Sequence, residues 1–262
     1  MWQRYVAVGD SFTEGIGDIG PDGVPRGWAD RFAEELAVRN PDLQYANLAV
    51  RGRRMRSIVA EQLPAALRAE PDLISLVGGV NDVLRPTWSL LAVSDALEGG
   101  VAEARRSGAD VLLITYGEPD RNSRLLRRVR QRLADYRDEV LRISEQYDCL
   151  LLDLWHVNNF HDARFWSPDR LHLNSLGHQR MSWAVMEAVG LSAPDWQQSL
   201  PDEDSAALVG RVASNLMWTG NYFLPWVGRR LLGRSSGDGV RAKRPNLEPI
   251  FSPAEQSQSI DQ

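Results

Sequence analysis

A serine, an aspartate and a histidine stand at positions from which they could perform nucleophilic catalysis. Ser11 follows the first apolar run of the chain. Asp169 precedes His172 by three residues, in a loop after the last apolar run. A serine hydroxyl attacks a carbonyl poorly unless a neighbouring base takes its proton. Asp169 can turn back and accept an imidazole N–H from His172, which leaves the other ring nitrogen to face Ser11. These residue types indicate acyl-transfer chemistry.

Ser11 taken alone predicts a helix cap as readily as a nucleophile, because serine is a favoured capping residue. The interpretation therefore depends on the histidine. The chain has three other histidines, His156, His161 and His178, for which we expect ordinary packed or solvent-exposed positions. His172 differs because a carboxylate stands at the right offset, in a loop expected at the same edge of the fold as Ser11.

Acyl transfer also needs hydrogen-bond donors that point at the developing oxyanion. Asn81 follows the third apolar run and offers its side-chain amide. Gly52 follows the second run and can present a backbone N–H with no side chain in the way. Each of these residues taken singly is typical of a turn between a strand and a helix. The order of the motifs, at the ends of successive apolar runs, favours a single site.

Five short apolar runs alternate with longer helical patterns along the chain. This alternation predicts parallel strands joined by helices, and runs that are apolar on both faces fit a sheet covered on both sides. Ligands bind such sheets at the carboxyl ends of the strands, where the motifs fall. The predicted strands are residues 5–8, 43–48, 72–77, 110–115 and 149–154. The predicted helices are residues 27–38, 57–69, 89–106, 123–146 and 174–189.

The motifs together resemble the four blocks of the SGNH hydrolase family, the GDSL-type lipases and esterases. These blocks are Gly-Asp-Ser at Ser11, a glycine at Gly52, Gly-x-Asn-Asp around Asn81, and Asp-x-x-His from Asp169 to His172. The resemblance implies an α/β fold, a flavodoxin-like three-layer α/β/α sandwich whose five-stranded parallel sheet has the strand order 2-1-3-4-5. It implies that Ser11 is the nucleophile, that His172 is the general base and then acid, and that Asp169 orients the imidazole. The backbone N–H groups of Ser11 and Gly52 and the side chain of Asn81 would form the oxyanion hole.

Two further features of these blocks concern charge. We expect Asp10 and Asp82 to hold loops by accepting backbone N–H bonds, without a chemical role of their own. The second block is unusually basic, because Arg51, Arg53 and Arg54 surround its glycine at the expected rim of the site. This basic rim leaves the charge of the substrate open and allows for an acidic group near the scissile ester.

Apolar and aromatic residues next to the third and fourth blocks are candidates for the walls of a substrate pocket. They are Val83, Leu84, Trp88, Phe165 and Trp166. Such side chains suit an acyl chain or an aryl ester, and ordinary loop packing explains them equally well.

The composition excludes several other classes of protein. A chain of 262 residues with 43% hydrophobic and 25% charged residues is typical of a soluble globular protein. The net charge of −5 argues against a nucleic-acid binder, which needs a basic surface. The single cysteine, Cys149, allows no internal disulfide, and we expect neither a metal nor a cofactor. The sequence shows no secretory signal or apolar membrane span, so we expect a cytoplasmic location.

The chain divides into a predicted hydrolase domain, residues 1–192, and a C-terminal part of different composition. We expect residues 193–234 to form a helical, aromatic extension packed on the domain, and residues 235–262 to be a disordered tail. Basic and aromatic residues interleave in 217–244, which also permits contact with an anionic membrane surface. Packing on the domain is the preferred interpretation. The oligomeric state stays open.

The predicted function is a serine esterase that hydrolyses acyl or acetyl esters of a small molecule, a lipid or a sugar. An acyltransferase or a thioesterase would use the same three residues. A flavin- or nucleotide-binding protein is the alternative of another class, because residues 11–15 after a first strand also resemble a phosphate-binding loop. That alternative gives Asp169 and His172 no role. A non-catalytic interaction module is the third possibility.

Overall fold

A single sheet forms the centre of the computed structural model, which describes residues 1–118, 127–201 and 236–251. Within these residues the sheet has six strands in the order β5-β4-β3-β1-β2-β6. The strands are β1 (Arg4–Gly9), β2 (Gln44–Asn47), β3 (Leu73–Val77), β4 (Asp110–Ile114), β5 (Leu150–Leu152) and β6 (Arg244–Pro249). Strands β1 to β5 are parallel, which confirms the predicted α/β fold and the order 2-1-3-4-5.

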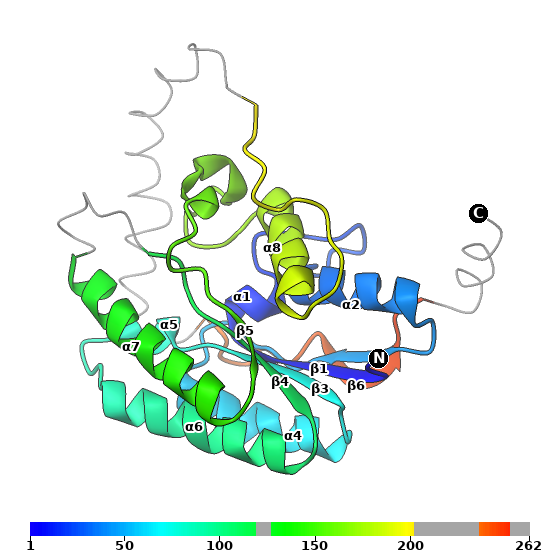
Figure 1. Ribbon diagram of the computed structural model, residues 1–262, viewed down its shortest axis with the longest axis horizontal. Coiled ribbons are helices and arrows are strands. Elements are labelled where there is room, and N and C mark those ends of the chain that lie inside the picture. The colour runs from blue at the N-terminus through cyan, green and yellow to red at the C-terminus, as the bar shows by residue number, and fades with distance from the viewer. Residues whose placement is uncertain (119–126, 202–235, 252–262) are drawn as a thin grey trace.

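Helices cover both faces of this sheet (Figure 1). On one face lie α1 (Ser11–Glu14), α2 (Trp28–Arg39) and α8 (Ser175–Ala188). On the other face lie α4 (Leu63–Arg68), α6 (Leu90–Arg106) and α7 (Arg127–Gln146). Each face has its own apolar core, and β3 contributes to both, with Leu73 and Val77 in one core and Ile74 and Leu76 in the other. A strand apolar on both faces is what a doubly covered sheet requires.

The helix that leads into α4 contains a π-helical segment, η1 (Ile58–Gln62), preceded by α3 (Met55–Ser57). This widened turn brings the side chain of Gln62 to the end of β1. There its Oε1 accepts from the N–H of Gly9 at 2.8 Å, and its Nε2 donates to the carbonyl of Gly9 at 2.9 Å. Gln62 therefore binds both the N–H and the carbonyl of the residue that ends β1, which fixes the start of the loop that follows.

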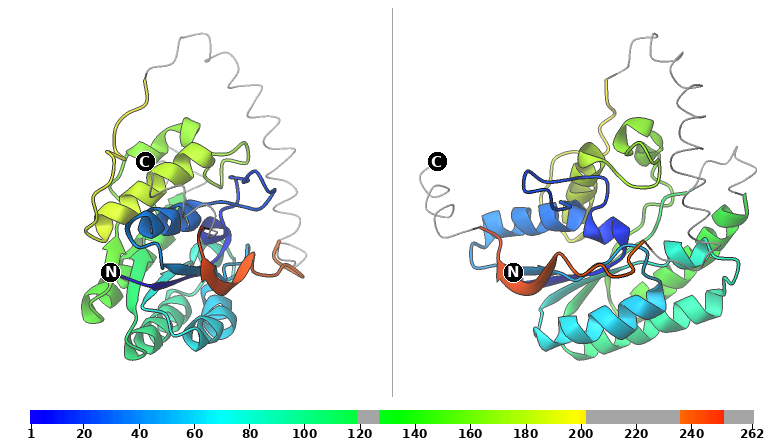
Figure 2. Two further views of the ribbon diagram at one scale, coloured as in Figure 1. Left: turned by 90° about the vertical axis from the view of Figure 1, so that its right-hand side faces the viewer. Right: turned by 180° about the vertical axis from the view of Figure 1, so that it is seen from behind.

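Strand β6 corrects the predicted five-stranded sheet, and it shows that residues 244–249 of the predicted disordered tail are ordered. It pairs antiparallel with β2 at the edge of the sheet, with Pro249 opposite Gln44 and Arg244 opposite Asn47 (Figure 2). The guanidinium of Arg244 lies 5.6 Å from the centre of the Tyr45 ring and donates to the Tyr45 carbonyl. Backbone pairing holds this edge strand, and prolines are tolerated at an edge. The composition of residues 244–249 therefore gave no signal of a strand.

The chain after α8 stays on the domain as far as residue 201. Trp196 is 4% exposed, stacks on Phe160 at 6.2 Å, and donates its indole N–H to Glu187 at 3.0 Å. Most of the predicted extension, including the aromatic stretch from residue 217, lies outside the described residues. Within residues 1–118, 127–201 and 236–251, no helix is both long enough and apolar enough to cross a membrane.

Candidate active site

Ser11 is the first residue of α1, directly after the end of β1. The cap of this helix is Asp10, whose carboxylate accepts from the N–H of Phe12 at 3.1 Å. The capping role considered for Ser11 therefore belongs to its neighbour, and the Ser11 hydroxyl bonds elsewhere. Gly9 permits the tight turn, because a Cβ at this position would lie 2.5 Å from the Val77 carbonyl oxygen.

His172 connects Asp169 to Ser11. Its Nδ1 lies 2.6 Å from Oδ2 of Asp169, and its Nε2 lies 2.9 Å from Oγ of Ser11. In the tautomer that fits both contacts, Nδ1–H donates to the carboxylate and Nε2 accepts the serine proton. The imidazole side chain is 17% exposed, so a substrate can reach this row of groups while most of the ring is covered. The structure thus brings together the three residues that the sequence singled out.

A tight turn before α8 holds Asp169 in place. Its Oδ1 accepts from the backbone N–H groups of Leu171 at 2.9 Å and His172 at 3.0 Å, and from the hydroxyl of Ser167 at 2.5 Å. Arg170, at a φ of 55°, closes the turn in the left-handed region. Partial burial acts to raise the pKa of Asp169, but the contact with His172 and these hydrogen bonds hold it well below its usual range. The carboxyl is therefore ionised and can stabilise an imidazolium.

The loop after β2 places Gly52 in the left-handed region, at a φ of 74°. The residue before it is held by Glu14, the last residue of α1. The Glu14 carboxylate accepts from the backbone N–H of Arg51 at 2.6 Å and also pairs with its guanidinium. Glu14 is only 3% exposed, so α1 and the Gly52 loop form one rigid unit. This role of Glu14 was not predicted, because its neighbours Thr13 and Gly15 carry no apolar pattern that would indicate a buried carboxylate.

Asn81 joins the loops that follow β1, β2 and β3. It lies in α5 (Val80–Val83), and its side-chain amide donates to Asp10 at 2.9 Å and to the carbonyl of Arg53 at 3.1 Å. Both amide hydrogens already have acceptors in this structure. Asn81 can therefore donate to an oxyanion by sharing one of these hydrogens or by giving up the bond to Arg53.

Asp10 and Asp82 both accept backbone N–H bonds, as the sequence analysis expects. Asp82 binds the N–H of Met55 at 2.9 Å, which ties the loop after β3 to the loop after β2. Asp10 is fully buried, and burial raises its pKa to about 6, although its bonds to Phe12 and Asn81 act in the opposite direction. The two carboxylates thus position the loops around Ser11.

Comparison with known proteins gives this arrangement a family. A sequence model of the GDSL-like lipase/acylhydrolase family matches residues 7–180, which contain all of the site described above. The chain belongs to this family. It is accordingly a hydrolase that acts on esters. No curated protein matches the sequence.

Solved structures share the fold. An acetylxylan esterase, Axe2 from Geobacillus stearothermophilus, is 20% identical, with a TM-score of 0.61 over 76% of this chain and 97% of its own. TesA is 21% identical, with a TM-score of 0.61 over 72% and 98% of the two chains. LAE5, an α/β hydrolase from the metagenome of Lake Arreo, Spain, is 25% identical, with a TM-score of 0.59 over 72% and 95%.

The predicted pocket walls of this GDSL-like hydrolase need correction. Val83 and Phe165 are both 0% exposed and belong to apolar cores, so neither presents a surface to a substrate. Trp166 is partly buried and donates its indole N–H to Phe160 at 2.7 Å. Trp88 packs edge-on against Tyr136, and Leu84 is half-buried at the end of α5. Loop packing, the alternative considered for these residues, explains Val83 and Phe165.

The other histidines of the hydrolase lie where an ordinary packing or surface role is expected. His178 is fully buried, accepts from the N–H of Trp28 at 3.1 Å, and has a pKa lowered by burial to about 4. His161 bonds to the carbonyl of Glu118 at 3.0 Å, and His156 is exposed. In the part of the chain that the structure describes, no three His, Cys, Asp or Glu side chains form a possible metal site.

Proposed function

We propose that the protein is a serine esterase that hydrolyses carboxylic esters through an acyl-Ser11 intermediate. The observation that carries the proposal is the pair of contacts made by His172, 2.9 Å to Ser11 and 2.6 Å to Asp169. A serine, a base that can take its proton, and a carboxylate that holds the base are the groups that this chemistry requires.

In the first step Oγ of Ser11 attacks the ester carbonyl while Nε2 of His172 takes the hydroxyl proton. Asp169 stabilises the resulting imidazolium. The backbone N–H groups of Ser11 and Gly52 and the amide of Asn81 donate to the tetrahedral oxyanion. The C–O bond to the alcohol then breaks, His172 returns the proton to the departing alkoxide, and the acyl group stays on Ser11.

In the second step water replaces the alcohol. His172 takes a proton from the water as its oxygen attacks the acyl carbonyl, and the same donors bind the second oxyanion. The bond to Oγ breaks, Ser11 recovers its proton from His172, and the carboxylic acid leaves. The site therefore returns to its starting state without another reactant.

The structural relatives support this assignment of roles. Three of the Axe2 structures are described as catalytic mutants, in which a serine, an aspartate or a histidine is replaced by alanine. Their aspartate and histidine stand three positions apart, as Asp169 and His172 do here. We propose an ester of a small molecule, a lipid or a sugar as the substrate, with acetyl esters as the first to test.

The test compares the wild type with Ser11→Ala and His172→Ala on p-nitrophenyl esters of increasing acyl length. We expect both variants to lose activity by about 1,000-fold or more, because each removes a member of one catalytic unit. Ser192→Ala and His156→Ala replace exposed residues of the same types and should retain wild-type rates. Wild-type turnover by Ser11→Ala would refute the proposal, and the chain-length profile would identify the preferred acyl group.

A further inference from the structure

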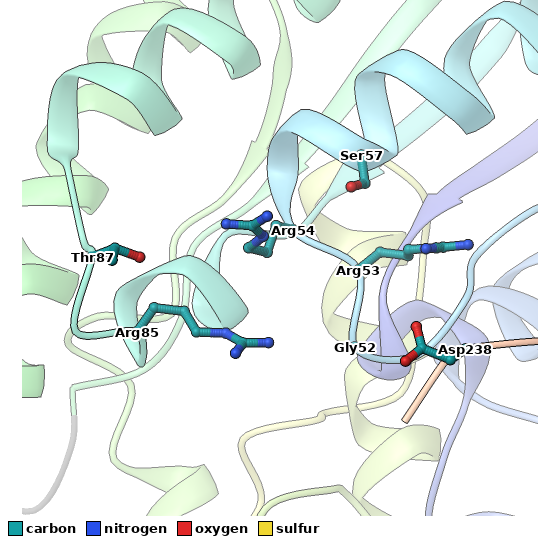
Figure 3. A pocket seen from close by; sticks show the side chains of 7 residues that line it. All are labelled: Gly52, Arg53, Arg54, Ser57, Arg85, Thr87 and Asp238. Carbon is teal, nitrogen blue, oxygen red and sulfur yellow. The ribbon is translucent and has the colours of Figure 1, made fainter. Parts of the chain in front are cut away.

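A polar cavity lies beside the loop that carries Gly52. Its volume is about 280 Å³, and its walls come from the loop after β2 and α3, from the segment after α5 and from the C-terminal segment (Figure 3). The lining residues are Gly52, Arg53, Arg54, Ser57, Arg85, Thr87 and Asp238. Nearly all of them are polar, and three are arginines, which an acyl-chain pocket does not require.

The arginines of this cavity differ in their partners. Arg53 forms an ion pair with Glu61 at 3.1 Å, and its guanidinium points away from the other two in Figure 3. Among the described residues, no carboxylate or carbonyl bonds to the side chain of Arg54 or Arg85. The Nε of Arg85 is moreover buried without a hydrogen-bond acceptor. A buried donor of this kind is rare, because leaving it unpaired costs free energy.

Arg85 is held in place by its backbone. Its N–H donates to the carbonyl of Asp82 at 2.9 Å, and its own carbonyl accepts from the guanidinium of Arg132 at 3.0 Å. From this fixed point the side chain extends toward Gly52, into the open space below Arg54 in Figure 3. Among the described residues that line the cavity, Asp238 supplies the one carboxylate, so Arg54 and Arg85 outnumber the acidic groups there.

The cavity adjoins the groups assigned to the oxyanion hole. Gly52 is part of both, and the carbonyl of Arg53 accepts a hydrogen bond from Asn81 at 3.1 Å. Asp82, which anchors Arg85, follows Asn81 directly in α5. A group bound between Arg54 and Arg85 would therefore belong to a substrate whose carbonyl oxygen lies at Gly52 and Asn81.

We propose that this cavity binds an anionic group, a carboxylate or a phosphate, carried by the ester substrate. The proposal rests on the proposed esterase function and narrows its substrate class to negatively charged esters. Guanidinium groups bind such anions through paired, charge-assisted hydrogen bonds. The guanidinium groups of Arg54 and Arg85, which both line the cavity, supply the donors for such an anion.

The test uses pairs of esters that differ in one charge. On the acyl side, the p-nitrophenyl monoester of glutaric acid is compared with p-nitrophenyl valerate, which has the same chain length. On the alcohol side, p-acetoxybenzoate is compared with its methyl ester. For each pair the quantity is the ratio of kcat/KM for the anionic ester to that for the neutral ester. Taking the ratio on one protein sample removes any difference in the folded fraction.

We expect the ratio of at least one pair to fall about 10-fold or more in Arg85→Met, the loss of one charge-assisted hydrogen bond. Arg54→Met should lower the same ratio. The matched control is Arg56→Met, which removes an exposed arginine of α3, two positions after Arg54, that does not line the cavity. The pair that responds shows whether the anion lies on the acyl or the alcohol part.

The inference is overturned if both ratios stay within about 2-fold of wild type in Arg85→Met and Arg54→Met, or if Arg56→Met lowers them equally. Failure of the esterase function would look different. In that case Ser11→Ala would hydrolyse p-nitrophenyl valerate as fast as wild type, whatever the arginine variants do.

Discussion

Replacing Lys243 by methionine should destabilise the protein, although it is the one lysine of the chain and lies far from Ser11 in sequence. Its Nζ donates to the carbonyl of Glu14 at 2.6 Å, to the carbonyl of Pro25 at 2.7 Å and to Asp30 at 2.5 Å. The lysine side chain is 8% exposed and that of Asp30 is 15% exposed. This buried ion pair therefore fastens the C-terminal segment to α1 and α2.

The magnitude follows from what the substitution leaves behind. Removing one partner of a buried ion pair costs about 3 to 5 kcal/mol, because the other charge stays buried. Asp30 keeps hydrogen bonds from Gly27 at 2.8 Å and Tyr45 at 3.1 Å, so we expect the lower end, about 3 kcal/mol. The loss should depend on pH. Burial already raises the pKa of Asp30, Lys243 lowers it, and removing the lysine raises it further.

A carboxyl group whose pKa is raised by folding contributes stability at low pH and loses it as the pH rises through the folded-state pKa. The deficit of Lys243→Met should therefore be larger at about pH 8 than at about pH 5. Urea unfolding followed by tryptophan fluorescence measures it at each pH. Arg241→Met, an exposed change two positions away, is the control. A deficit below about 1 kcal/mol, or one that grows toward acid, would refute the reasoning.

Two further variants test the supports of the site. Glu14→Gln should lower kcat/KM for a neutral ester about 10-fold, because the buried carboxylate that holds Arg51 beside Gly52 is lost. The control Glu35→Gln alters the surface pair with Arg39 and should leave kcat/KM unchanged. His178→Gln should reduce the loss of the free energy of unfolding at acid pH. Burial lowers the pKa of His178 from 6.5 to about 4, so the wild type loses about 3 kcal/mol as the pH falls through that window. His156→Gln should retain the wild-type pH dependence of the free energy of unfolding, and equal curves for all three proteins would contradict the assignment.

Much of the fold was predictable because apolar periodicity reports burial directly. Residues 72–77 were expected to form a strand, and β3 (Leu73–Val77) is buried throughout. The resemblance to SGNH hydrolases added the order of the parallel strands, which periodicity does not contain. Strand β6 was missed because pairing with β2 depends on backbone groups at an open edge, and its prolines and charges resemble a loop. Lys243 was missed for a related reason, since its buried partners lie on distant elements.

The candidate site was predictable to the extent that topology brings its residues together. Parallel strands place the residues that follow them at one edge, and Asp169 and His172 share one turn there. Which apolar loop residues face the substrate could not be predicted. Val83 and Phe165 have the composition of a pocket wall, yet both point into the core, because burial satisfies an apolar side chain equally well.

The proposed role of Ser11 is tested most directly by covalent labelling. A fluorophosphonate that reacts with activated serines is added to the wild type and to His172→Ala, and the labelled peptide is identified by mass spectrometry. We predict one label per chain, on Ser11, and labelling slowed by about 1,000-fold in His172→Ala, since the activating base is gone. A label on another serine, or an unchanged rate of labelling in His172→Ala, would contradict the proposal that His172 activates Ser11.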